Sequence, residues 1–124
     1  MGSINFQAKV GNSNVEVTVG LTLYRWDEDG VYYVYSPALD LYGYGNTPVD
    51  ATNSWEITFE EFIKYTHNKG TIFDELEKLG WTVNRKKKRV RAPEVEEMEN
   101  NNLDFKNILK KSIVTEDKRL PILV

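Results

Sequence analysis

The chain has 124 residues, a formal net charge of −3 and no cysteine. This length predicts one domain, and the lack of cysteine excludes thiol catalysis, cysteine-ligated zinc and a disulfide framework. The net negative charge gives no global attraction to nucleic acid, so any such contact must come from a local basic patch.

The N-terminal sequence predicts a cytoplasmic protein. Met1 to Phe6 contain no basic region followed by an apolar run, so we expect no signal peptide. No segment reaches the roughly 18 apolar residues that a membrane-spanning helix requires, so we expect no membrane partner.

The first half of the chain predicts antiparallel strands. Apolar and polar residues alternate at Ile4–Val10 and again at Val15–Leu23, on either side of the turn residues 11–14. A period of two gives a sheet one apolar and one polar face. Asp27–Gly30 predicts a turn, which would make Val31–Tyr35 the returning strand of a hairpin.

A proline break and two glycines follow this hairpin. Proline cannot donate to a ladder, so Ser36-Pro37 predicts the end of the strand, and Ala38–Tyr44 is expected to cross over and form another short strand. Gly43 and Gly45 permit a bent backbone or the close approach of another segment.

Two helices are then predicted. Thr47 is a suitable N-cap, Pro48 fits the first helical turn, and the helix should end near Asn68 or Gly70. Its apolar stripe comprises Ala51, Trp55, Phe59, Phe62, Ile63 and Thr66. A second, short helix is predicted from a cap at Thr71 to a stop at Gly80, with a strand at Trp81–Val83 after it.

Candidate catalytic and metal-binding groups are isolated from one another. His67 has no Ser, Cys or second His as a partner, so we interpret it as a residue at the C-terminal end of its helix. The acids Asp27–Asp29 lack the spacing of a calcium loop, and Asp40 has no second carboxylate in the strands. We therefore expect no enzyme, no metal and no cofactor.

The most basic segment of the chain is residues 85–91, where six of seven residues are Lys or Arg. The six are Arg85, Lys86, Lys87, Lys88, Arg89 and Arg91. They would either follow phosphates or meet an acidic protein, or they would form the solvated face of a strand or hairpin. Both interpretations stay open.

Pro93 marks a boundary, after which the chain is polar. A short helix is predicted at Leu103–Lys111, with Phe105, Ile108 and Leu109 on one side. An isolated helix this short is marginal in water. We expect the tail either to dock on its own domain or to fold on a partner.

The segment from Asp29 to Thr47 resembles the HicB antitoxin family. Asp29-Gly30-Val31-Tyr32-Tyr33-Val34 leads into Ser36-Pro37-Ala38-Leu39-Asp40, and Tyr42-Gly43-Tyr44-Gly45-Asn46-Thr47 then leads into the long helix. In that family an acidic-glycine turn leads a strand into a Cys/Ser-Pro-x-Leu segment, and a Gly-x-Thr element begins the main helix. The resemblance covers about residues 15 to 83, including the stretch Thr71–Trp81.

The resemblance implies an α+β fold of the partial ribonuclease-H-like type. A three- to four-stranded antiparallel sheet would pack on one main helix plus a short second helix. Residues 1–92 would form this HicB-like domain, and residues 93–124 would be a C-terminal tail that binds a partner or docks on the domain. The implied activity is neutralisation of a HicA-type toxin, a small ribonuclease that cleaves mRNA, by steric occlusion. Such antitoxins usually self-associate.

The residues predicted to bind the toxin lie in the Pro37–Gly45 segment and in the tail helix. They are Pro37, Leu39, Asp40, Tyr42, Tyr44, Phe105, Ile108 and Leu109. The alternative function is a nucleic-acid-binding transcriptional regulator that uses the basic residues 85–91. Many family members bind DNA through a C-terminal helix-turn-helix or ribbon-helix-helix domain. No helix-turn-helix pattern follows Trp81 here. Residues 85–91 would supply the ribbon of the second type, but residues 94–101 and 103–111 are short for its two helices.

Overall fold

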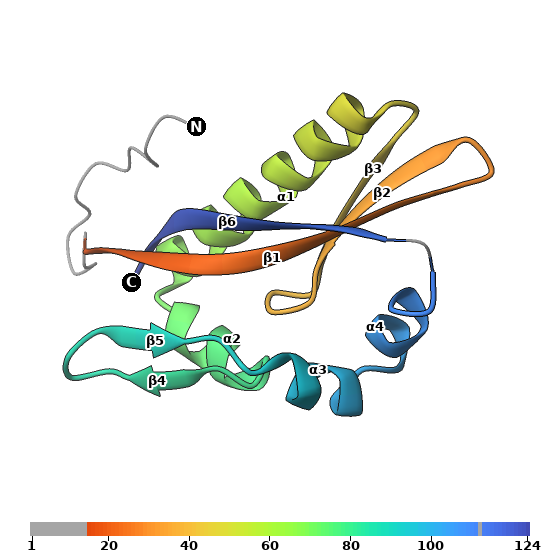
Figure 1. Cartoon of the computed structure of the whole chain (residues 1–124). Helices are drawn as coiled ribbons and strands as arrows, with labels where there is room; N and C mark the ends of the chain where they lie inside the picture. The colour runs from red at the N-terminus through yellow and green to blue at the C-terminus, as the bar shows by residue number, and fades with distance from the viewer. Residues whose placement is uncertain (1–14, 112) are drawn as a thin grey trace.

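The computed structural model describes residues 15–111 and 113–124, and it places a four-stranded antiparallel sheet beside one long helix (Figure 1). The order of the strands across the sheet is β3-β2-β1-β6, and a separate two-stranded hairpin is formed by β4 and β5. The expected strand at 4–10 lies outside the described residues. The elements in chain order are β1 (Glu16–Glu28), β2 (Val31–Ser36), β3 (Leu41–Gly45), α1 (Pro48–Lys69), α2 (Ile72–Lys78), β4 (Thr82–Asn84), β5 (Arg89–Arg91), α3 (Val95–Asn101), α4 (Leu103–Ile108) and β6 (Val114–Leu123).

The apolar face of β1 packs in the main core, as its alternating pattern predicts. Val19, Leu21 and Leu23 are buried in the cluster that also contains Trp55 of α1. The expectation of a solvated opposite face is wrong at Tyr24. Its side chain is only 5% exposed because α4 covers it.

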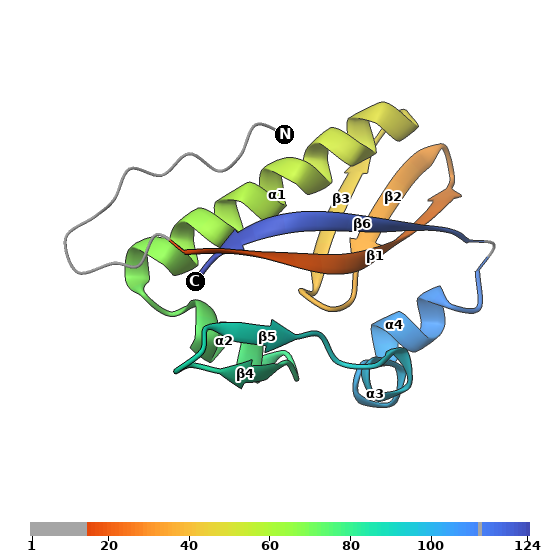
Figure 2. The ribbon, with the colours of Figure 1, turned by 60° about the vertical axis from the view of Figure 1, so that its left-hand side comes forward.

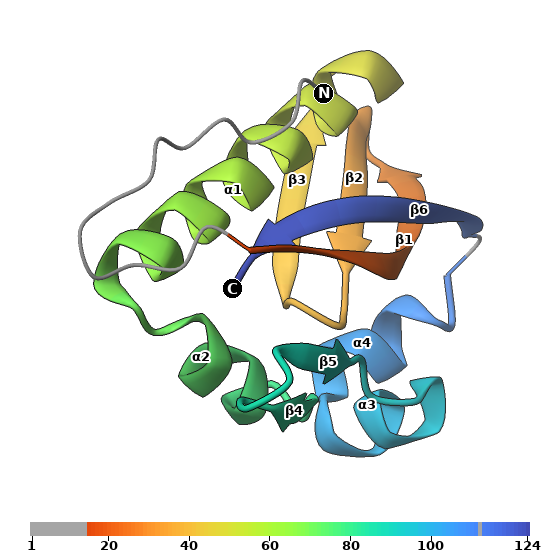
Figure 3. The same ribbon diagram turned by 90° about the vertical axis from the view of Figure 1, so that its left-hand side faces the viewer.

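The long helix α1 begins and ends where its sequence predicts. The side chain of Thr47 accepts a hydrogen bond from the backbone N–H of Asp50 at 3.0 Å, and Gly70 closes the helix with a left-handed φ of 67°. Helix α1 lies along one face of the sheet (Figure 3). Of its predicted stripe, Ala51, Trp55, Phe59, Ile63 and Thr66 are buried.

The turn between β2 and β3 is fixed by two tryptophans. The indole N–H of Trp55 donates to Oγ of Ser36 at 3.0 Å, and that of Trp81 donates to the carbonyl oxygen of Ala38 at 2.6 Å. Both bonds are buried, so each supplies a partner that the indole N–H would otherwise lack. This segment therefore holds a defined conformation between the sheet, α1 and the start of β4.

The start of α2 differs in detail from the prediction. Thr71 occupies the cap position, but its side chain makes no capping hydrogen bond. The Thr71 backbone has a φ of −114° and a ψ of 10°, outside the extended conformation from which a side chain usually caps. Its carbonyl oxygen still accepts from the backbone N–H of Glu75. The predicted stop is confirmed, because Gly80 follows α2 with a φ of 93°.

The last segment of the chain docks on its own sheet. Strand β6 pairs antiparallel with β1 from Glu16↔Leu123 to Arg25↔Val114, and the two strands run side by side in every view (Figure 2). Pro121 is tolerated because β6 is an edge strand with a neighbour on one side only. A proline, which has no backbone N–H, removes no hydrogen bond on the side that has no neighbouring strand. Residues 93–124 therefore supply one strand of the main sheet and the two short helices beside it. No helix in the described part of the chain has the length and hydropathy needed to cross a membrane.

Candidate binding surfaces

The face of the sheet opposite α1 carries two rows of aromatic side chains. The strand register pairs Tyr24 with Tyr35 and Tyr35 with Tyr42, and it pairs Trp26 with Tyr33 and Tyr33 with Tyr44. Each row thus crosses three strands, one residue per strand. We call Tyr24–Tyr35–Tyr42 the covered row and Trp26–Tyr33–Tyr44 the open row.

Tyr24 and Tyr35 of the covered row lie under α4, and Tyr42 at its end is partly exposed. The ring of Phe105 packs edge-on against Tyr24 at 5.1 Å between centroids, and Tyr35 is fully buried. The Tyr35 hydroxyl donates to Oδ1 of Asp40 at 2.7 Å and accepts from the amide of Asn102 at 2.9 Å. Burial, together with the hydrogen bond to Asp40, raises the pKa of Tyr35 well above its usual range. This tyrosine is a neutral, structural group.

The open row is stacked at one end and exposed at the other. The rings of Trp26 and Tyr33 are stacked, with 5.2 Å between their centroids and an angle of 14° between their planes. The ring centroids of Tyr44 and Tyr33 are 6.4 Å apart, and Tyr44 is 66% exposed. Stacking of this kind fixes ring orientations without covering the last ring. The row therefore presents Tyr44 from a rigid support.

Acidic side chains lie at one end of the open row. Asp27, Glu28 and Asp29 follow Trp26 along β1 into the β1–β2 turn, at the Trp26 end of the row. A hydrogen bond from Lys111 holds the pKa of Glu28 below its usual value. The row thus has an exposed ring, Tyr44, at one end and an acidic turn at the other, an arrangement suited to a protein partner with apolar and basic groups.

The structure divides the eight predicted toxin-binding residues into accessible and buried sets. Tyr42 and Tyr44 are 38% and 66% exposed, and Asp40 is exposed as well. Pro37 and Leu39 are buried in the turn held by the two tryptophans.

The tail helix requires a correction. Phe105 and Ile108 are buried against Tyr24, Trp26 and Tyr35 of their own chain, and Leu109 is half-buried beside them. Phe105 and Ile108 cannot be toxin contacts in this conformation, because the sheet already occupies their apolar surface.

Sequence reasoning missed the row that Trp26 and Tyr33 form with Tyr44, in which Trp26 is buried and Tyr33 is half-buried. The signal was present, because aromatic residues recur two positions apart in three consecutive strands. The three pairs are Tyr24 and Trp26, Tyr33 and Tyr35, and Tyr42 and Tyr44. Side chains two positions apart share a face of a strand, so the three pairs together predict an aromatic surface.

The basic residues 85–91 form the turn and second strand of the β4–β5 hairpin. Arg85 is held against α2, where its guanidinium pairs with Asp74 at 2.7 Å and with Glu77, and lies over the ring of Phe73. Hydrogen bonds from Arg85 to these two carboxylates raise its pKa. Residues 85–88 form the turn and β5 spans Arg89–Arg91, so the segment has the expected geometry of a hairpin.

A cavity of about 570 Å³ opens between the 37–40 turn, the end of α2 and helices α3 and α4. Asp40, Glu97 and Asp104 line it together with Lys78. Within residues 15–111 and 113–124, no group of three or more His, Asp or Glu side chains is placed to hold a metal ion. His67 is buried in the last turn of α1, at the position that its sequence context predicts.

Two surfaces of the protein are candidates for binding a partner: the open row on the sheet and the basic β4–β5 hairpin. No protein-family model, no curated protein and no solved structure matches the chain.

Proposed function

We propose that this protein is a non-catalytic antitoxin of the HicB type, which binds a HicA-type toxin and covers its RNA-cleaving surface. The observation that carries the proposal is the open row, in which Trp26 and Tyr33 support an exposed Tyr44. The family resemblance of the surrounding segment supports the choice of partner.

The finer fold assignment is part of the same proposal. Three consecutive antiparallel strands followed by a long helix on one face of the sheet support the partial ribonuclease-H-like interpretation. A cytoplasmic location, which the N-terminal sequence predicts, also belongs to the proposal, as does self-association, which follows from the resemblance.

The chemistry of the open row suits a ribonuclease as partner. An exposed Tyr such as Tyr44 supplies a large contact area with few rotatable bonds, and side chains of this kind commonly dominate the energy of protein interfaces. A toxin that binds RNA must carry positive charge on its RNA-binding surface. The acids of the β1–β2 turn, Asp27 and Asp29, would complement that charge and favour encounter in the correct orientation.

The mechanism that we propose is steric occlusion. Tyr44 and Tyr42 lie on β3, whose backbone is packed directly against α1. A partner docked on this strand would meet a surface that does not reorganise, which lowers the entropic cost of binding. The bound sheet would exclude mRNA from the toxin, and no chemistry is required of the antitoxin.

The experiment is a titration of the protein into a purified HicA-type toxin from the same genome, with mRNA cleavage as the readout. We expect cleavage to fall to background near an equimolar ratio, with a complex visible by gel filtration. Unchanged cleavage at a tenfold excess of the protein, together with no complex, would contradict the proposal. A HicA-type toxin from an unrelated source controls for non-specific inhibition.

A further inference from the structure

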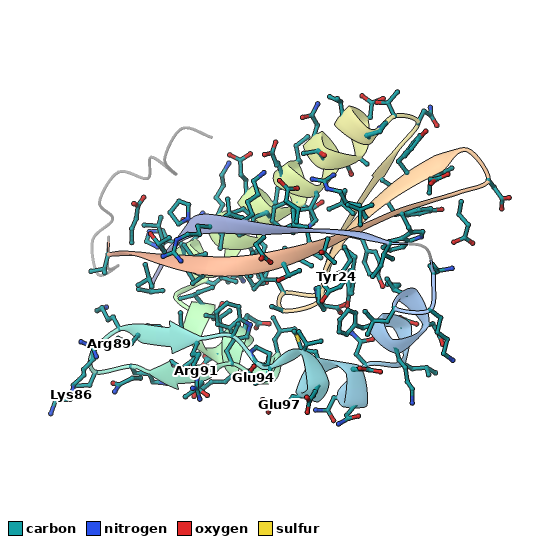
Figure 4. All side chains as sticks on the ribbon, in the orientation of Figure 1. Tyr24, Lys86, Arg89, Arg91, Glu94 and Glu97 are labelled. Carbon is teal, nitrogen blue, oxygen red and sulfur yellow. The ribbon has the colours of Figure 1, made fainter. Side chains whose placement is uncertain are left out.

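The β4–β5 hairpin presents its basic side chains outward. Val83 pairs with Val90, and both pack against the main core, so the residues on either side of them face away from it. Arg89 and Arg91 therefore share the outer face of β5. Lys86 lies in the turn, and Lys86 and Arg89 project from the turn end of the hairpin (Figure 4).

Most of this charge is not neutralised within the protein. Arg85 is paired with Asp74 and Glu77. In the described part of the chain, none of the other five basic groups of the hairpin has a carboxylate oxygen within 4.0 Å. These five are Lys86, Lys87, Lys88, Arg89 and Arg91.

The positive charge of the chain is concentrated in this hairpin, whereas the rest of the chain is acidic. Six of the 16 basic residues of the chain fall within residues 85–91, so ten basic residues face 19 acidic ones elsewhere. Like charges in one tight turn repel each other, and that repulsion is relieved when an anion with several charges binds.

We propose that the β4–β5 hairpin binds the phosphodiester backbone of nucleic acid, independently of base sequence and of the toxin-binding surface. Side chains two residues apart on a strand are separated by roughly 6.6 Å, which lets Arg89 and Arg91 contact different phosphates of one backbone. A two-stranded ribbon of this kind also fits the major groove of duplex DNA.

The composition of the hairpin favours nucleic acid over an acidic protein. Its outer face and turn contain Thr82, Asn84 and basic residues, with no aromatic or aliphatic side chain. Protein interfaces take their energy mainly from buried apolar and aromatic groups and are depleted in lysine, whereas phosphate contacts dominate binding to nucleic acid. The lysine-rich turn matches the second pattern.

Arg85 has a positioning role in this proposal. Its guanidinium joins the start of the turn to two carboxylates of α2 and to the ring of Phe73. The side chain of Asn84 also accepts a hydrogen bond from the backbone N–H of Lys87 at 3.0 Å, which closes the turn. The hairpin is thus oriented before a ligand arrives, so less conformational entropy is lost on binding.

The test measures binding to a fluorescent duplex of random DNA sequence over a series of salt concentrations. If all five free basic groups contacted phosphates, log Kd would change with log salt with a slope of up to about 4.5. The variant K86A/K87A/K88A should bind on the order of tenfold more weakly at low salt and lose about 2.7 from the slope if each lysine contacts one phosphate.

The matched control is K64A/K106A/K110A. It removes three exposed lysines and the same total charge from other parts of the chain. We expect its salt slope to equal that of the unaltered protein. Thermal melting of both variants checks that they fold, and the salt slope of the unaltered protein tests the proposal even if the hairpin variant does not fold.

Several outcomes separate the alternatives. Equal binding to duplex DNA, duplex RNA and single strands supports contact with phosphates alone, and a preference for duplex DNA supports the ribbon in the major groove. The proposal is overturned by a salt slope near zero, by equal losses in the two triple variants, or by equally tight binding to poly-glutamate. Inhibition of the toxin should be unaltered in K86A/K87A/K88A, so the two proposals fail separately.

Discussion

Gly43 of β3 lies directly against the backbone of Trp55 on α1. A β-carbon at Gly43 would stand 2.6 Å from the α-carbon of Trp55 and 2.7 Å from the carbonyl oxygen of Ala51. Only a residue without a side chain permits this approach. The contact places the helix backbone on the strand that carries Tyr42 and Tyr44, and so it supports the proposed docking surface from behind.

The first prediction concerns this contact. Replacing Gly43 with alanine should lower the free energy of unfolding by about 3 kcal/mol or more, because two backbone segments would have to separate. The control is Gly20→Ala, where an added methyl group meets nothing within 4 Å. That change should be neutral or stabilise the protein by roughly 0.5–1 kcal/mol. Urea unfolding of the two variants makes the measurement, and equal stabilities would contradict the contact.

The second prediction concerns the turn between β2 and β3. Ser36→Ala removes the acceptor for the buried indole N–H of Trp55 and should cost about 1–3 kcal/mol of unfolding free energy. Ser54→Ala is the matched change, because Ser54 accepts from the Tyr44 backbone N–H at an exposed position where water can replace it. Its cost should stay below about 1 kcal/mol. A larger loss for Ser54→Ala would show that the turn is not held by the indole.

The third prediction is a loss of stability at alkaline pH. Burial raises the pKa of Tyr24, Tyr35 and Tyr42 in the folded protein. Because the pKa of each tyrosine is higher in the folded protein than in the unfolded chain, each contributes to the free energy of unfolding. That contribution is fully present below the pKa of tyrosine in the unfolded chain, about 10, and it is lost as the pH rises above that value. The slope is at most about 1.36 kcal/mol per pH unit for each tyrosine kept neutral.

The variant Tyr35→Phe separates this effect from general alkaline damage. It removes the group with the largest increase in pKa, so unfolding free energies measured between pH 9 and 11.5 should fall less steeply than in the unaltered protein. An identical alkaline slope in the variant would show that Tyr35 ionises as freely in the folded state as in the unfolded chain.

The fourth prediction tests whether the tail docks on its own chain. Phe105→Ala empties a fully buried site beneath the covered row and should cost about 3–5 kcal/mol. Leu103→Ala, in the same helix, changes a side chain that is 72% exposed and should stay within about 0.5 kcal/mol. If thermal unfolding were equal in the two variants, α4 would not be packed on the sheet in solution.

The elements with strong local signals were predictable from the sequence. The N-terminal cap at Thr47, the stop at Gly70 and the apolar stripe that contains Trp55 all depend on neighbours within a few residues. The alternation at Val19, Leu21 and Leu23 likewise fixes which face of β1 is buried. Short-range chemistry determines these features, so the sequence alone indicates them.

The place of the tail was not predictable in the same way. Val114–Thr115–Glu116–Asp117 is charged and exposed, and it becomes a strand because β1 offers an open edge about 90 residues earlier in the chain. The sequence leaves open whether Phe105 docks on its own domain or on a partner, because nothing local shows that Tyr24 and Tyr35 form its pocket. Such long-range pairing depends on the whole fold, which also explains why Trp26 and Tyr33 were missed as neighbours of Tyr44.

The central claim is that a toxin docks on the open row, and two exposed tyrosines allow a matched test. Tyr44 lies on the open row and Tyr65 lies on α1, with exposures of 66% and 60%. Isothermal titration of each alanine variant into the HicA-type toxin compares them directly. We expect Tyr44→Ala to weaken binding by about 2 kcal/mol, roughly thirtyfold, and Tyr65→Ala to leave Kd unchanged within about twofold. Equal affinities of the two variants would contradict the claim.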